Sequence, residues 1–134
     1  MADTQDIVVL RTPRGSRALP VMRVIMGGVA SRHQLPFERL DDLQLAVETL
    51  LAEEPEEGEE FVLTLSGDAR GFCVRLEGLH NQTLRTTLLA TEPFQPCEGC
   101  LLDVRLFLDA LVDRYQVLGD AGDSFAVEFE KWAS

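Results

Sequence analysis

Apolar residues recur at helical spacing in the stretch LDDLQLAVETLLA, residues 40–52. They fall at i, i+3, i+7, i+10 and i+11, which is one face of a 3.6-residue helix. The members of this stripe are Leu40, Leu43, Val47, Leu50 and Leu51. We therefore predict a core helix from about Pro36 to Glu54, with its apolar face packed against the rest of the fold.

Three further stretches have helical patterns. Ala18 to His33 repeats apolar residues at i, i+3, i+7 and i+10. Gly27 and Gly28 lie inside it, and each costs about 1 kcal/mol relative to alanine, so we expect a close helix–sheet or helix–helix approach there. A short helix is predicted from about Gln82 to Ala90, and a strongly amphipathic one from Cys100 to Tyr115.

Alternating or β-branched runs predict the strands. Asp6 to Thr12 forms a first strand that ends at a proline. Phe61 to Ser66 and Gly71 to Glu77 alternate apolar and polar residues around a four-residue turn, which predicts a hairpin. Tyr115 to Gly119 and Ser124 to Glu130 predict a closing hairpin, with residues 131–134 as a tail.

The order of these elements is β, α, α, β, β, α, α, β, β. Helices and strands segregate, which is typical of an α+β two-layer sandwich. We predict a single domain over residues 1–134, in which about three helices pack on one face of a mainly antiparallel mixed sheet.

Charge narrows the classes of partner. The chain has 12 basic and 23 acidic residues, a net charge of −11, so nucleic-acid binding is disfavoured. Residues 53–60, EEPEEGEE, predict a solvated acidic loop. No apolar run is long enough to cross a bilayer, and the first residues lack the pattern of a signal peptide. A cytoplasmic protein without membrane association is expected.

The cysteines leave one alternative open. Cys97 and Cys100 form a CxxC at the start of a predicted helix, where a thiol pKa could be lowered. A zinc site would need two more ligands, for which Cys73, His33 and His80 lack the usual paired spacing. Two reduced, incidental cysteines are the preferred interpretation, and we predict no metal.

Several segments resemble the histidine-kinase-type (Bergerat) ATPase fold, and more narrowly the bacterial anti-sigma-factor serine kinases. Residues 19–51, LPVMRVIMGGVASRHQLPFERLDDLQLAVETLL, are similar to the first two helices of that family. LFLDALVDRYQV (residues 106–117) and AVEFEKW (residues 126–132) are similar to its last helix and strand. The resemblance implies a histidine-kinase ATPase-like sandwich with a nucleotide site beside the second helix.

The nucleotide-binding boxes of that family are incomplete in this chain. Glu48 matches the catalytic glutamate, but Ala52 stands where an asparagine would hold magnesium, and a methyl group cannot ligate this ion. Of the Asp-x-Gly-x-Gly box only Gly78 is present. Glu77 could replace the aspartate only if the register slips by one residue, which would point it away from the face of Val74 and Leu76. Gly99 is what is left of the glycine turn at the last helix. We therefore predict no ATP or magnesium cofactor, and we interpret Glu48 as a remnant or a partner contact rather than a working base.

The resemblance thus favours a non-catalytic regulator. It would bind a sigma factor, an anti-sigma antagonist or a second copy of itself, through Asp6 to His33 and the acidic loop Glu53 to Glu60. One alternative is a divergent serine kinase that uses Glu48 as its base. Another is a small redox or zinc-stabilised protein that depends on its CxxC.

Overall fold

The five strands of the computed structural model form one sheet in the order β1-β2-β3-β5-β4, and every neighbouring pair is antiparallel. The structure describes residues 6–15, 17–33, 35–90, 104–119 and 122–132. The strands are β1 (Asp6–Thr12), β2 (Phe61–Gly67), β3 (Gly71–Leu79), β4 (Arg114–Leu118) and β5 (Phe125–Trp132).

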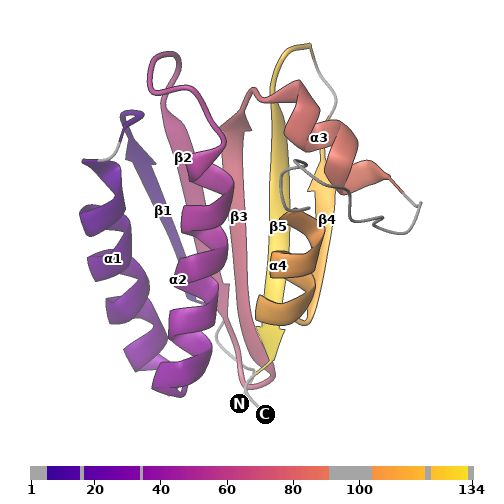
Figure 1. The fold of residues 1–134 in the computed structure, drawn as a ribbon. Coiled ribbons are helices and arrows are strands. Elements are labelled where there is room, and N and C mark those ends of the chain that lie inside the picture. Colours follow the sequence, from indigo (N-terminus) through magenta and orange to yellow (C-terminus); the bar gives the residue numbers. More distant parts are fainter. Residues whose placement is uncertain (1–5, 16, 34, 91–103, 120–121, 133–134) are drawn as a thin grey trace.

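Four helices in the described part of the chain cover one face of this sheet (Figure 1). They are α1 (Ala18–Arg32), α2 (Phe37–Ala52), α3 (Gln82–Leu89) and α4 (Val104–Leu111). Helices α1 and α2 lie side by side, and α4 packs next to α2. This arrangement confirms the predicted two-layer α+β sandwich.

The core lies between the two layers. On α2 the predicted stripe is confirmed, because Leu43, Val47 and Leu50 are fully buried and Leu40 and Leu51 pack partly buried against them. Burial of an aliphatic side chain of this size contributes about 1.5–3 kcal/mol. The strands supply the other half of the core through alternate residues, which are mainly Phe61, Leu63, Leu65, Phe72, Val74, Leu76, Phe125, Val127 and Phe129.

The remaining strand residues point to the opposite side, which we call the outer face. Strand pairing aligns one residue from each strand in a row across it: Ile7, Ser66, Cys73, Glu130 and Arg114. None of the described helices covers this face. Mixed polar and charged residues are usual on the solvated side of an antiparallel sheet.

The structure corrects the C-terminal element boundaries. The helix predicted to continue to Tyr115 ends at Leu111. The strand predicted from Tyr115 is confirmed, because Tyr115 pairs with Phe129 in the β4–β5 ladder. Lys131 and Trp132, predicted as a tail, belong to β5 and pair with Phe72 and Gly71 respectively. Tyr115 fits both the helical and the strand period, so local pattern alone could not assign it.

The glycine pair of α1 also differs from expectation. A Cβ added at Gly27 or Gly28 would meet nothing within 4 Å, so no close approach explains either residue. Gly28 is exposed on the side of α1 away from the core. Among the described residues, no helix is long and apolar enough to span a bilayer.

Candidate functional site

The predicted catalytic residue Glu48 faces α1. Its carboxylate forms an ion pair with Arg23, and the hydrogen bond and negative charge of Glu48 raise the pKa of that arginine. Ala52, one turn later, is exposed. Both residues line a small cavity of about 230 Å³ between the start of α1 and the end of α2, with Leu19 and Phe61 in its wall.

The other nucleotide-box positions lie elsewhere. Glu77 and Gly78, at the end of β3, line a hollow of about 410 Å³ on the outer face. The structure therefore brings Glu48 together with Ala52, and Glu77 together with Gly78, but the two pairs line different cavities. Gly99 and the CxxC cysteines, Cys97 and Cys100, fall outside the described residues.

A buried ion pair joins the turn after β1 to the end of α2. The side chains of Arg14 and Glu54 are 1% and 0% exposed, with Nη1 of Arg14 3.2 Å from Oε1 of Glu54. Arg14 also donates to the backbone carbonyls of Glu59, Pro55 and Gly78. One guanidinium group thus holds the acidic loop and the end of β3 together.

Glu54 extends this network to α3. Its two carboxylate oxygens accept hydrogen bonds from the backbone N–H groups of His80 (2.6 Å) and Asn81 (2.8 Å). Asn81 then caps α3 by accepting from the N–H of Leu84. The sequence predicts Glu54 in a solvated loop, and this prediction is wrong for this residue, because its side chain is fully buried. Its buried charge is tolerated because Arg14 and the two N–H groups compensate it.

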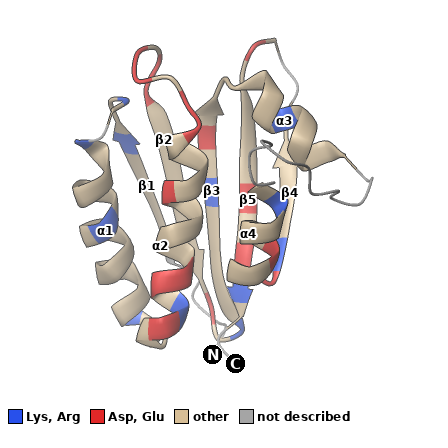
Figure 2. Cartoon of the chain, viewed as in Figure 1, with Lys and Arg blue, Asp and Glu red and all other residues tan. Residues whose placement is uncertain are grey.

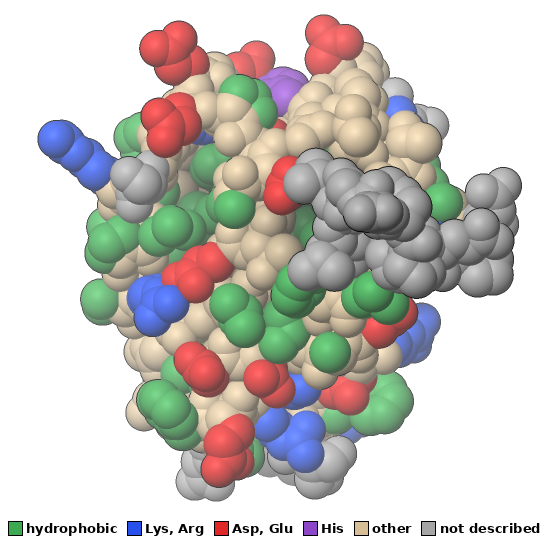
Figure 3. Space-filling model, viewed as in Figure 1, with side chains coloured by type: hydrophobic (Ala, Val, Ile, Leu, Met, Phe, Trp, Pro, Cys, Tyr) green, Lys and Arg blue, Asp and Glu red, His purple; other side chains and the backbone are tan. Residues whose placement is uncertain are grey.

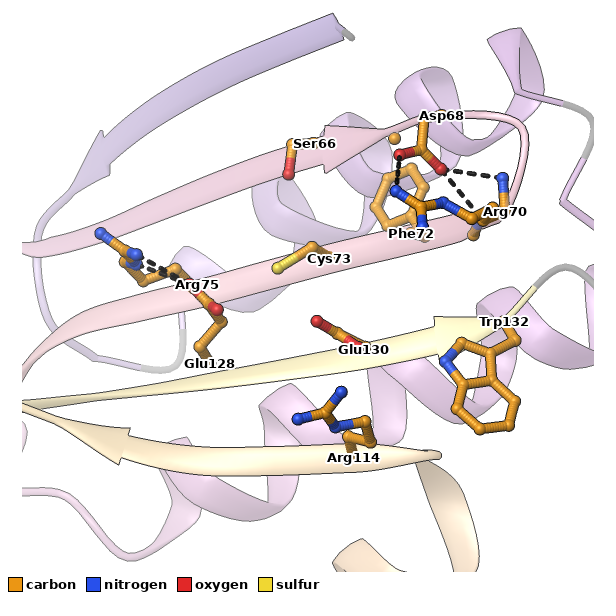
Figure 4. A pocket seen from close by; sticks show the side chains of 12 residues that line it. Ser66, Asp68, Arg70, Phe72, Cys73, Arg75, Arg114, Glu128, Glu130 and Trp132 are labelled. Atoms are coloured by element: carbon orange, nitrogen blue, oxygen red, sulfur yellow. Dashed lines mark hydrogen bonds and ion pairs between the residues drawn. The ribbon is translucent and has the colours of Figure 1, made fainter.

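A hollow of about 560 Å³ on the outer face extends from the end of β2 across β3 and β5 to β4 (Figure 4). Across its floor, Arg75 pairs with Glu128, with Nη2 2.8 Å from Oε2. Arg114 and Glu130 project into the same hollow, and the half-exposed ring of Trp132 stands at its border. The hollow therefore presents both charge signs rather than one.

Cys73 lies at the centre of this hollow (Figure 4). Burial, together with the negative charges of Glu128 and Glu130, raises the pKa of its thiol to about 11. A thiol of this kind stays protonated at neutral pH, and the thiolate is the nucleophilic form. The arrangement gives no support for cysteine chemistry at this position.

The outward side of α1 has a different character. Arg17, Val21, Val24, Gly28 and Arg32 are all exposed and recur at helical spacing; we call them the basic α1 face. Hydrophobic side chains gather over α1 on the helical side of the molecule (Figure 3). Residues 6–33 carry a net charge of +4 in a chain whose net charge is −11, but of their five arginines only Arg17 and Arg32 belong to this face. Arg14 is buried against Glu54, and Arg23 pairs with Glu48. Acidic residues concentrate elsewhere, notably in the loop between α2 and β2 (Figure 2).

Sequence reasoning missed the Arg14–Glu54 pair and the basic α1 face for different reasons. No local spacing links two residues forty positions apart. The basic face could have been found from helical spacing, since Arg17, Val21, Val24 and Arg32 recur on one side of the predicted helix.

Comparison with known proteins adds no family assignment. The chain matches no protein-family model, and no curated protein is significantly similar to it. Among the residues that the structure describes, no three His, Cys, Asp or Glu side chains group as a metal site would require.

Proposed function

We propose that this protein is a regulator that acts by binding another protein through its basic α1 face, without ATP. The proposed partner is a sigma factor or an antagonist of an anti-sigma factor, because the chain resembles the anti-sigma serine kinases. The observation that carries the proposal is the exposure of Val21 and Val24 between arginines on an otherwise acidic protein.

Charge and exposure together support a docking role. Val24 is 73% exposed and Val21 48%, and they are adjacent on one side of the helix. Apolar side chains ringed by basic ones suit a partner segment that carries apolar and acidic residues. The acidic loop between α2 and β2 repels such a segment, so the basic α1 face provides orientation as well as affinity.

Independence from ATP is supported at the second helix. Magnesium needs oxygen ligands, and Ala52 supplies none. Glu48 is occupied by Arg23 and faces α1. A working kinase would require Glu48 to act on a substrate hydroxyl, and phosphate transfer that Glu48→Gln abolishes would be its signature. No contact of the described residues favours that alternative.

The test is a calorimetric titration of the full chain against the purified sigma factors and anti-sigma antagonists of its own organism. We expect one of them to bind with the same affinity in the presence and absence of magnesium-ATP. Val24→Asp should weaken this binding at least tenfold, because it places a carboxylate in the apolar centre of the contact.

Leu89→Asp is the matched control, since Leu89 is 54% exposed on α3, away from the basic α1 face. It should bind like the unmodified chain. Binding to none of these proteins, or binding that requires ATP, would contradict the proposal. Equal losses in both variants would assign the contact to another surface.

A further inference from the structure

The free edge of β1 carries backbone groups that are available for pairing. β1 is the first strand in the sheet order, so β2 is its one neighbour among the described strands. In an antiparallel ladder, alternate residues turn their N–H and C=O groups to the neighbouring strand, and the others turn them outward. In the described part of the chain, no backbone hydrogen bond from a turn, loop or cap reaches residues 6–12. An open edge of this kind is a template for a further strand.

Helix α1 follows this edge along its whole length. The short connection after Thr12 brings the start of α1 next to the end of β1. At the other end of α1, the ring of His33 lies against Gly67, which is the ladder partner of Asp6. α1 therefore runs antiparallel to β1, and the two elements are about 22 and 23 Å long. Figure 1 shows both at the same border of the sheet.

The side of α1 above the free edge is apolar in the middle and basic at its ends. Arg23 pairs with Glu48 and so marks the side of α1 that faces α2. The basic α1 face lies on the opposite side of the helix, with its exposed valines between Arg17 and Arg32. Arg11, near the end of β1 next to Arg17, is exposed as well. Positive charge therefore borders both ends of the edge.

The apolar packing is incomplete at the same edge. On the helical side of the sheet, Val8, Leu10 and Ile25 pack against the core but stay partly exposed. On the outer face, Ile7 and Val9 are 61% and 57% exposed. A strand placed beside β1 would cover apolar side chains on both faces of the sheet.

We propose that β1 accepts an extended segment of the partner as a sixth strand, next to α1. This inference rests on the proposed function and specifies how the partner binds. The segment has apolar side chains in its middle, which pack against β1 and Val21. It has acidic side chains at its ends, which meet Arg17 at one end of the edge and Arg32 at the other. Strand addition gains affinity from backbone hydrogen bonds and specificity from alternate side chains.

A second copy of this chain fits the edge less well. Antiparallel pairing of two β1 strands about a two-fold axis reverses α1 together with β1. Arg17 of one copy then lies towards Arg32 of the other at both ends of the contact. Like charges disfavour such a dimer, whereas a segment with acidic ends meets both arginines favourably.

The opposite edge of the sheet lacks these features. β4 has five residues and β1 has seven, and short edge strands offer less backbone for pairing. None of the large exposed hydrophobic residues in the described part of the chain lies on β4. β4 is therefore the comparison edge for the experiments.

The first experiment is a calorimetric titration of the full chain with a synthetic peptide of alternating valine and threonine that carries two glutamates at each end. We expect saturable binding. A peptide with lysines in place of the glutamates should bind at least tenfold more weakly.

Two charge variants of the protein locate the binding site of this peptide. Arg17→Glu should weaken binding at least tenfold. Arg114→Glu changes the net charge equally but lies on β4, so it should bind like the unmodified chain; circular dichroism checks that both are folded. No binding of the acidic peptide would overturn the proposal, as would equal losses in the two variants.

The second experiment detects the new strand directly. Residue-resolved amide hydrogen exchange of the full chain, measured by NMR, should show alternate amides of β1 slowed at least tenfold by the acidic peptide, with those of β4 unchanged. Unchanged exchange in β1 at saturating peptide would overturn strand addition. Protection of β1 that depends on protein concentration without peptide would assign the edge to a second copy and overturn it too.

The same exchange measurement separates this inference from the proposed function. A sigma factor or antagonist that binds, is weakened by Val24→Asp and leaves β1 exchange unchanged would overturn strand addition alone. Peptide addition to β1 without binding of any of those regulators would contradict the proposed function alone.

Discussion

Two arginine–glutamate pairs in this protein differ chiefly in their surroundings. Arg14 and Glu54 are 1% and 0% exposed, whereas Arg75 and Glu128, on the outer face, are 44% and 17% exposed. The buried pair also has three backbone carbonyls and two backbone N–H groups as partners. The buried Arg14–Glu54 pair thus holds four chain segments together. The exposed Arg75–Glu128 pair lies on a surface that is open for contact.

This difference teaches how charge is used in the fold. A buried ion pair is tolerated only when its remaining hydrogen-bonding groups are satisfied, which makes removal of either partner costly. An exposed pair is screened by water and contributes little to stability. Its arginine and glutamate can therefore take part in a contact with another molecule at little cost to the fold.

The largest expected effect separates the two pairs directly. Arg14→Met leaves Glu54 buried without its counter-charge and should lower the free energy of unfolding by about 3–5 kcal/mol. The matched change Arg75→Met should cost about 0–1 kcal/mol, because its pair is exposed. Urea denaturation measures both. Losses of equal size would show that burial does not distinguish the pairs.

The next prediction concerns Gly78, whose carbonyl is one of the acceptors of Arg14. Its φ is +93°, and an added Cβ would lie 2.8 Å from the carbonyl oxygen of Glu60. Gly78→Ala should therefore destabilise the fold by about 1–3 kcal/mol. Gly28→Ala is the control, since open space surrounds it within a helix, and it should stabilise by up to about 1 kcal/mol. Thermal melts of both variants check the opposite signs.

A smaller effect concerns the alkylation rate of Cys73, which lies beside the exposed Arg75–Glu128 pair. Because burial and the neighbouring glutamates raise the pKa of Cys73 to about 11, its alkylation should be slow at pH 8. The rate should rise about tenfold per pH unit until it approaches that pKa, since only the thiolate reacts. Iodoacetamide kinetics in the Cys97→Ser/Cys100→Ser background measure it. A rate that levels off near pH 9 would mean that the outer face is more open to water around this residue.

The sequence predicts the parts of this fold that follow from periodicity. The stripe on α2 and the alternation in β2 and β3 each identify the buried face, because one period allows only one set of residues to point inward. Tyr115 shows the limit, since it fits a helix and a strand equally and only its pairing with Phe129 decides.

The candidate sites were less accessible to sequence reasoning. Six glutamates in residues 53–60 look alike, and only the approach of Arg14 from forty positions away makes Glu54 different. The position of Glu48 next to α1 likewise depends on how two helices pack. In contrast, the basic α1 face follows from residue type and helical spacing and was within reach of the sequence.

The most direct test of the central claim, regulation without nucleotide, is a calorimetric titration of the full chain with magnesium-ATP. We predict no binding, because Ala52 offers no magnesium ligand and Glu48 is held by Arg23. A saturable isotherm with micromolar affinity would contradict the account and restore the kinase as the leading hypothesis.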